Sequence, residues 1–456
     1  MCGGKNLSQS CKTLERSAGT VRPFRFRLEP FHMHSLTFAR GASALVAAAA
    51  LIGCGGGGDD AAPADASAPS IAATASPHDQ EVQALQAREA QEREALLAQG
   101  PPPLLSSRKP EFGLLDLLRG KHLFERETFD GNGRTCRTCH SRDTGTVSPH
   151  DAQQRFAANP HDPLFRADGS DDGQGHGTTR MLKDATVLVR IPLPDNVSIA
   201  NDPSARSVVL RRGIPTTLNT PALDDKLMLD GRHSSLVAQA RGAIGDHAQA
   251  QREPRADELQ QIAAFQLTPG FFSSFTMLKF AYTGAKPQLP AGRSAAEQRG
   301  RRFFVDAAPS GDFKTGLCAG CHSGGMLNET NEFIPAPPFE RGGRFQSVGV
   351  SEFNDLGNPV QQWRFTNADG TVTEFASPDP GRALITGDAR DAQTRNAFKI
   401  PSLWGAARTA PYFHDNSAKT LDDVARHYAR FFKAISPIEL TEQDQQDMVA
   451  YMKLLR

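Results

Sequence analysis

The chain has 456 residues, and its 51 basic and 51 acidic side chains give a formal net charge of zero. This balance argues against nucleic acid as a partner, because binding a phosphate backbone requires an excess of basic residues. At about 100–200 residues per domain, the length predicts two or three domains.

Residues 1–53 are interpreted as a signal region, with Met33 as the expected start of translation. The apolar run at 44–52 is shorter than the roughly 20 residues that span a bilayer, but it has the length of a signal-peptide core. The sequence L-I-G-C, which ends at Cys54, resembles a bacterial lipobox and implies a lipid on this cysteine. An ordinary secretory signal is the alternative. The lipid would anchor the protein on the periplasmic side of a bacterial membrane.

Residues 54–105 are expected to form a flexible tether that begins at the lipidated Cys54, followed by a solvated helix. The tether is rich in Gly, Ala, Pro, Ser and Asp and cannot bury a core. Residues 79–99 are rich in Glu, Gln and Ala, a composition that favours an exposed helix.

The remaining chain is predicted to form two domains, 106–292 and 293–456. Each begins with an amphipathic helix ahead of a C-x-x-C-H motif and ends in another helix, which indicates an internal duplication. The expected helices lie at 112–124, 258–267, 294–304 and 441–455. Long loops follow each motif, one of them at 141–220. Residues 363–375 alternate around a turn signal and predict a small hairpin.

The C-x-x-C-H pattern is the attachment signature of a c-type haem, in which two thiols bond the haem edge and the histidine ligates iron. With 7 Cys and 13 His in the chain, one accidental match is expected about 0.003 times. Two matches therefore predict two c-type haems. The residues are Cys136, Cys139 and His140 in the first motif, and Cys318, Cys321 and His322 in the second.

These cysteines have two alternative uses. A zinc ion could take all four thiolates as ligands, but this leaves the histidine after each pair unexplained. A thiol–disulfide pair would suit a thioredoxin-like pattern, which the sequence lacks. Export also favours haem, because c-type attachment takes place outside the bacterial cytoplasm.

The chain resembles the bacterial di-haem cytochrome c peroxidases and the MauG-type enzymes over roughly residues 108–456. Besides the two haem motifs, the resemblance rests on L-N-T-P-A-L at 218–223, D-G-R at 230–232, K-I-P-S-L at 399–403 and T-A-P-Y-F-H-D at 409–415. It implies a mainly α fold with two cytochrome c-type domains, each with one covalently bound haem, plus long loops and a small hairpin.

The resemblance also implies a distal ligand for the C-terminal haem. In the family this ligand is commonly Met, fourteen residues after the His of P-Y-F-H, whereas here that position is Tyr428. MauG-type enzymes resemble this chain in using Tyr. A phenolate is a hard anionic donor and should favour ferric iron. His427 is the second candidate, and simple core packing of Tyr428 is the third interpretation.

For the N-terminal haem, the region that aligns with the family's distal His, 208–215, contains no His. The resemblance therefore implies an iron open on one side; His176, in an upstream loop, is a weaker candidate ligand. The family's Gln and Glu beside this haem correspond to Gln239 and Gln249. Because a neutral amide cannot take a proton, His247 or Asp246 would have to serve as the acid–base group.

A calcium ion lies between the two domains in the family. The resemblance places its ligands here at Asn219, through its side chain, and at the carbonyls of Thr409 and Pro411. One side-chain oxygen and backbone carbonyls suit a hard cation.

These observations lead to two hypotheses of different classes. The first is an exported di-haem oxidoreductase that uses hydrogen peroxide to oxidise an electron donor or a protein substrate at the N-terminal haem, with electron relay through the C-terminal haem. The second is a non-catalytic di-haem electron-transfer cytochrome. The absent Glu at 249, and Leu229 where many relatives carry Trp, favour the second. The donor, and whether the protein is a homodimer, stay open.

Overall fold

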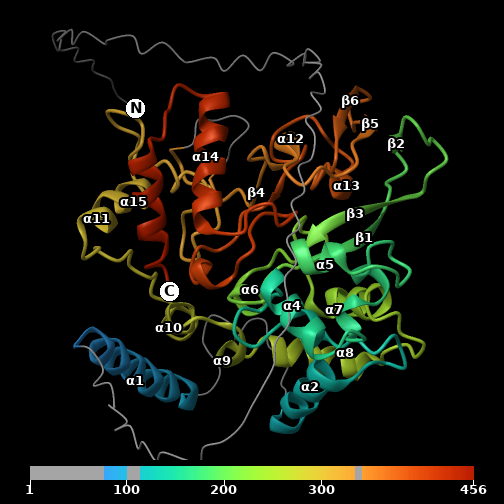
Figure 1. The fold of residues 1–456 in the computed structure, drawn as a ribbon, viewed down its shortest axis with the longest axis horizontal. Coiled ribbons are helices and arrows are strands. Elements are labelled where there is room, and N and C mark those ends of the chain that lie inside the picture. The colour runs from blue at the N-terminus through green and yellow to red at the C-terminus, as the bar shows by residue number, and fades with distance from the viewer. Residues whose placement is uncertain (1–76, 100–112, 334–340) are drawn as a thin grey trace, which may run out of the picture. The chain divides into compact units, whose positions relative to one another are not determined.

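A computed structural model describes residues 77–99, 113–333 and 341–456 (Figure 1). The predicted signal region, the lipid site at Cys54 and the tether that follows it lie outside these residues. Within the described ranges, none of the helices combines the length and the apolar character needed to cross a bilayer.

Helices predominate, as the sequence predicted. The α-helices are α1 (Pro77–Ala98), α2 (Leu114–Arg126), α3 (Cys136–Cys139), α4 (Pro149–Ala158), α5 (Thr179–Asp184), α6 (Thr220–Leu223), α7 (Leu236–Asp246), α8 (Ala256–Gln266), α9 (Pro269–Phe272), α10 (Phe275–Thr283), α11 (Ala295–Arg301), α12 (Val350–Phe353), α13 (Ala383–Thr386), α14 (Leu421–Ile435) and α15 (Glu442–Met452). The strands are β1 (Thr186–Pro192), β2 (Val197–Ile199), β3 (Ser207–Gly213), β4 (Phe345–Gln346), β5 (Gln361–Thr366), β6 (Val372–Ser377) and β7 (Phe398–Lys399).

The predicted duplication is visible in how two helix pairs pack. Helix α2 packs on α8, and α11 packs on α15 (Figure 1). Both pairs touch at a glycine: a Cβ on Gly120 would overlap the carbonyl oxygen of Gln261, and a Cβ on Gly300 would overlap that of Asp447. The helix before each C-x-x-C-H motif therefore meets the closing helix of its half at backbone distance, which only glycine permits.

Local sequence sets where several helices begin. Ser294, Thr420 and Thr441 each accept a hydrogen bond from the backbone three residues on, and an acidic residue at that position completes a capping box. These pairs satisfy backbone N–H groups that the first helical turn leaves without a partner. The helices expected at 112–124, 258–267, 294–304 and 441–455 are all confirmed, the third ending in a 3-10 turn, Arg302–Phe304.

The expectation of a long loop at 141–220 is wrong, because helices α4 and α5 and strands β1 to β3 lie within it. Strands β1 and β3 pair antiparallel, with Val189 opposite Leu210, and α4 and α5 precede them. In both strands buried apolar residues alternate with more exposed ones, which is the period of a half-buried strand. The Asp, Gly and Pro residues between these elements made the alternating pattern hard to recognise, because it extends over few residues.

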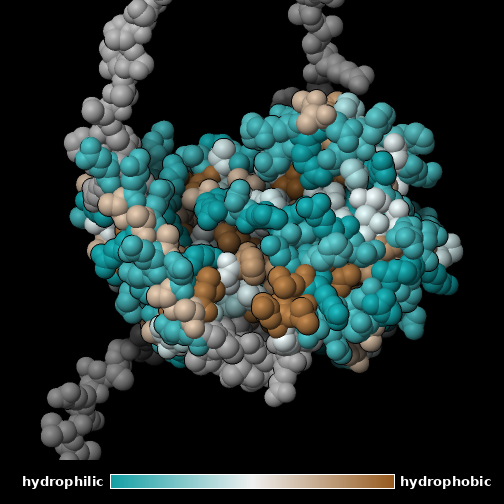
Figure 2. All heavy atoms as spheres, turned by 90° about the horizontal axis from the view of Figure 1, so that it is seen from below, coloured by the Kyte–Doolittle hydropathy of each residue, from teal (hydrophilic) through white to brown (hydrophobic). Residues whose placement is uncertain are grey.

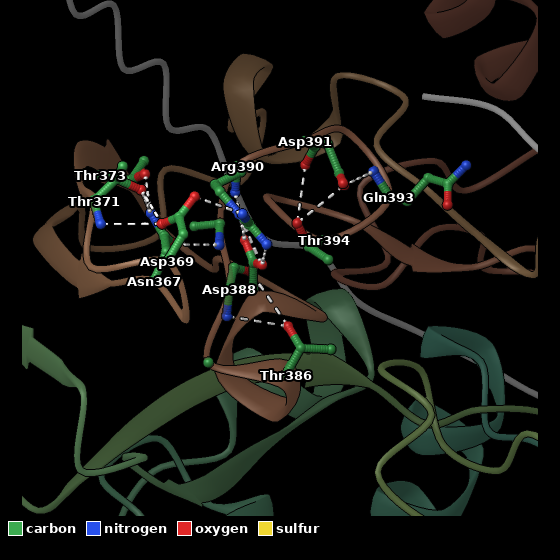
Figure 3. A network of polar contacts seen from close by, with 12 residues as sticks. Asn367, Asp369, Thr371, Thr373, Thr386, Asp388, Arg390, Asp391, Gln393 and Thr394 are labelled. Carbon is green, nitrogen blue, oxygen red and sulfur yellow. Dashed lines mark hydrogen bonds and ion pairs between the residues drawn. The ribbon is translucent and has the colours of Figure 1, made fainter. Parts of the chain in front are cut away.

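The hairpin predicted at 363–375 is confirmed as β5 and β6, and β2 extends it to three strands. Trp363 is buried and its indole N–H donates to the carbonyl of Ser377 at 3.0 Å. Figure 3 shows the polar network at the turn, where Arg390 bonds both Asp369 and Asp388. These contacts tie the turn to the segment after α13.

A buried ion cluster joins the two halves. Arg212 on β3 is 1% exposed and bonds both oxygens of Asp379 at 2.7 and 2.9 Å, and Asp230 of the D-G-R motif at 2.5 Å. Although burial alone would lower the pKa of Arg212, the two carboxylates raise it above its ordinary value. The guanidinium therefore stays charged and holds residues from both halves together.

The surface carries apolar side chains at the start of α2. Leu114, Leu115 and Leu118 are exposed there. Figure 2 looks at the molecule from below the view of Figure 1, the side on which α2 lies, and shows brown groups within a mostly teal surface. These leucines lie outside the packed core.

We expect Gly300→Ala to lower the free energy of unfolding by up to about 2 kcal/mol, because an overpacking cost of roughly 1–3 kcal/mol opposes a gain in helix propensity of about 1 kcal/mol. The control is Gly245→Ala in α7, where a new Cβ meets nothing within 4 Å and only the propensity gain should remain. Urea unfolding of the haem-loaded protein measures both. Equal effects of the two substitutions would contradict the close helix contact.

Candidate haem and peroxide site

The first C-x-x-C-H motif forms the short helix α3 directly after the loop that follows α2. Cys136 and Cys139 are free thiols. Cys136 packs against an apolar cluster of the N-terminal half, and Cys139 packs against a cluster that also includes Trp363 and Phe365 of the second half. Desolvation raises the pKa of the Cys136 thiol to about 12, and it also raises the pKa of Cys139. Burial therefore favours the neutral thiol at both positions.

The two motif histidines make the same contact. His140 Nδ1 lies 2.8 Å from the carbonyl oxygen of Gly145, and His322 Nδ1 lies 2.8 Å from that of Leu327, in each case five residues later. Desolvation lowers the pKa of His140 to about 4 and also lowers that of His322. A neutral ring with hydrogen on Nδ1 leaves the Nε2 lone pair for a metal ion.

One cavity gathers most of the residues predicted for the N-terminal site. Cys136, Cys139 and His140 line it together with Gln239 on α7 and His247 at the end of that helix. The rest of the wall is largely apolar and includes residues of α2, β1 and α7. Arg212 of the buried ion cluster and Leu229, the residue before D-G-R, also line it.

Gln249 lies apart from these residues. It does not line the cavity, and its side-chain oxygen accepts a hydrogen bond from Asn132 Nδ2 at 3.3 Å. The weaker candidate His176 is exposed and pairs with Asp172 at 2.6 Å. The structure thus brings Gln239 and His247 to the cavity of His140 and leaves Gln249 and His176 outside it.

Sequence reasoning missed the partner of His247. Its Nδ1 lies 2.5 Å from Asp168 Oδ2, and Asp168 also forms an ion pair with Arg134. Burial by itself raises the pKa of Asp168, but the hydrogen bond from His247 and the charge of Arg134 outweigh it, so the pKa lies below its ordinary value. Because 79 residues separate Asp168 from His247, no local pattern could have paired them.

The second motif faces a packed cluster that includes Tyr428. Cys318, Trp404 and Tyr428 belong to the same apolar cluster. Desolvation, together with the nearby Cys321 and Cys318 sulfurs, raises the pKa of Tyr428 above its ordinary value. The neighbouring His427 instead points its Nε2 at the carbonyl oxygen of Val348, 2.7 Å away.

The residues expected at a calcium site lie near the contact of the two halves. Asn219 donates through Nδ2 to the carbonyl of Trp404 at 2.6 Å, and its Oδ1 accepts from Ser274 N–H at 2.7 Å. Thr409 and Pro411 follow a 3-10 turn that comes soon after Trp404. Calcium at these three residues stays a prediction.

The four motif cysteines do not form one metal site. Among the described residues, no group of three or more His, Cys, Asp or Glu side chains is arranged to hold a metal ion. This arrangement removes the basis for the four-cysteine zinc alternative, because zinc would require all four sulfurs at one point.

Comparison with known proteins gives relatives of one kind. The chain is 30% identical over 210 residues to cytochrome-c peroxidase IdrP1 of Denitromonas iodatirespirans, which covers 42% of this chain and 48% of that protein. It is 29% identical over 119 residues to the methylamine utilization protein MauG of Methylophilus methylotrophus, which covers 24% of this chain and 35% of that protein. The matches span about half of these relatives' own length or less. No family model matches the chain.

Among solved structures, a MauG-like protein associated with microbial copper homeostasis aligns with a TM-score of 0.43 and 21% identity, over 78% of this chain and 92% of that protein. The sequence relatives confirm the predicted resemblance to the di-haem cytochrome c peroxidases and MauG. This chain is similar in sequence to those enzymes.

Such relatives imply c-type haem as the cofactor, and the residues present fit that group. Each motif offers two unpaired thiols for thioether bonds and one imidazole whose Nδ1 contacts a backbone carbonyl, so that Nε2 is the ring atom that would ligate iron. At the first motif these groups line a mainly apolar cavity, which is the setting a macrocycle needs.

We expect the protein, produced in a host that attaches c-type haem, to carry two covalent haems per chain. The double substitution Cys136→Ser and Cys139→Ser should leave one, because it removes both bonds to one haem. Intact-mass spectrometry and the pyridine haemochrome assay count them. A wild-type protein in which neither motif carries a covalent haem would contradict this assignment.

Proposed function

We propose that the protein is an exported di-haem c-type oxidoreductase, anchored by lipid on Cys54 at the periplasmic side of a bacterial membrane. It uses hydrogen peroxide to oxidise an electron donor or a protein substrate at the N-terminal haem. The observation that carries this proposal is the cavity that His140 shares with His247 and Gln239. It supplies a metal ligand and an acid–base group in one mainly apolar space.

The haem, when bound, supplies the redox chemistry, and the chain supplies the proton movement. Reduction of one hydrogen peroxide to two waters takes two electrons and two protons. Splitting the O–O bond also requires a proton to move from one oxygen to the other. His247 can accept this proton on Nε2 and return it, because the imidazole nitrogen that carries no hydrogen offers a lone pair. Gln239 can only hold peroxide by hydrogen bonds.

At the C-terminal haem we assign Tyr428 as the distal ligand. The position of Tyr428 near both cysteine sulfurs supports this assignment. His427, the other candidate ligand, directs its Nε2 at the Val348 carbonyl instead. A bound cation would stabilise the phenolate that the apolar cluster otherwise disfavours. An anionic oxygen ligand favours the ferric state, so it suits a haem that stores oxidising equivalents and not a haem that acts as a strong reductant.

A second candidate function is electron transfer without substrate chemistry. It is favoured by Gln249, which stands where relatives carry the acid–base Glu and does not line the cavity, and by Leu229 in place of an aromatic residue. The two functions differ in peroxide turnover, which an electron carrier lacks.

We expect His247→Gln to lower kcat/KM for hydrogen peroxide by about 10²–10⁴-fold, the usual contribution of an acid–base group. Gln249→Ala, outside the cavity, should change it by less than about threefold. Stopped-flow assays with a small reductant measure both variants. A wild-type protein that fails to consume peroxide with any small reductant would establish the electron-carrier function instead.

We expect electron paramagnetic resonance of the ferric protein to show one high-spin and one low-spin signal, from an open N-terminal and a closed C-terminal haem. Tyr428→Phe should remove the low-spin signal, because phenylalanine offers no ligand atom. The matched control is His427→Gln, which keeps a donor for the Val348 carbonyl and should preserve the signal. Its loss in the control variant would make His427 the ligand.

A further inference from the structure

The backbone and ring of His247 are fixed by residues from two distant segments. Asn132 Nδ2 donates to the His247 carbonyl at 2.9 Å, and Arg134 Nη1 donates to the same oxygen at 3.3 Å. Asp168 accepts from Nδ1 of the ring. Because Arg134 lies two residues before Cys136, these contacts tie the histidine to the haem-attachment motif.

Asp168 is itself held in place. Its side chain is 13% exposed and pairs with Arg134, whose side chain is 2% exposed. Arg134 also donates to three backbone carbonyls of the 163–166 segment, and Arg180 Nη2 donates to the carbonyl of Asp168 at 2.8 Å. The carboxylate thus has little freedom to leave the imidazole.

We propose that Asp168 is a positioning residue that keeps the hydrogen of His247 on Nδ1, so that Nε2 is the proton acceptor inside the cavity. This inference rests on the proposed function, since it concerns the same cavity, but it adds a residue that neither the motifs nor the resemblance indicates. A carboxylate accepts hydrogen bonds and cannot donate them, so it fixes one tautomer of a neutral imidazole. It also stabilises the imidazolium that forms when Nε2 takes a proton.

Asparagine at position 168 would remove this selection. Its amide can donate to Nδ1 as well as accept from it, which admits the tautomer with hydrogen on Nε2. That tautomer cannot accept a proton in the cavity. The same substitution keeps the size of the side chain, and Arg134 retains its carbonyl acceptors.

Ligand binding tests the inference without peroxide turnover. Hydrogen cyanide is protonated at neutral pH and binds ferric iron as cyanide anion, so its proton must pass to a base in the cavity. Carbon monoxide binds ferrous iron and has no proton to lose. Cyanide association therefore reports the base, and carbon monoxide association reports access to the iron.

We expect Asp168→Asn in the haem-loaded protein to slow cyanide association by about 10–100-fold, within the range of acid–base contributions, and to leave carbon monoxide association unchanged. His247→Gln should slow cyanide association to the same extent. The double variant should be no slower than either single one, because the two residues act as one unit. Asp168→Glu, which keeps the charge opposite Arg134, should give an intermediate rate.

The control is Asp172→Asn, which removes a similar carboxylate–imidazole pair from the exposed His176 and should leave cyanide association unchanged. Unaltered cyanide rates in both Asp168 variants, or additive effects in the double variant, would overturn the inference. Peroxide turnover, measured on the same samples, separates the two proposals. Slow cyanide binding in Asp168→Asn beside an inactive wild type would refute the proposed function and leave the role of Asp168 standing.

Discussion

The ion cluster of Arg212, Asp230 and Asp379 constrains the arrangement of the two halves, beside the pairing of β2 with β5 and the apolar cluster that Trp363 shares with the first half. A charged guanidinium taken out of water costs several kcal/mol unless it is paired and hydrogen-bonded, and removing one partner of a buried pair costs about 3–5 kcal/mol. Asp379 comes from the second half, and Asp230 from the segment that leads into α7. Arg212 also lines the cavity of His140, so one of the contacts that join the halves also forms part of the wall of the candidate site.

The two halves repeat one solution for presenting a haem-attachment histidine. In each half, a glycine lets the helix before the motif contact the closing helix at backbone distance. The carbonyl oxygen five residues after the motif histidine contacts Nδ1 of its ring. What differs is the set of polar side chains near each motif. His140 lines a cavity together with His247 and Gln239, whereas Tyr428 lies near the cysteine sulfurs of the second motif. Our proposal of a reacting centre and an electron-storing centre rests on this difference.

Periodicity predicted the helices well because each buries one apolar stripe, and the capping residues marked several of their starts. It failed for β1 and β3, whose alternation extends over seven residues each between segments rich in Asp and Gly. The division at 292 and 293 stays a prediction. The hairpin was predicted, but not its third strand, because β2 lies more than 150 residues before β5 and strand pairing over such a distance leaves no local signal.

The sequence by itself determined the chemistry that the chain can carry: two C-x-x-C-H motifs, the helices that flank them and the resemblance to di-haem peroxidases and MauG. Only the tertiary structure decided which polar side chains meet in the cavity. It placed His247 there beside Asp168 and left Gln249 outside. Counting along a motif fixes a residue's position in the chain, whereas the direction of its side chain depends on packing and hydrogen bonds with segments far away in sequence.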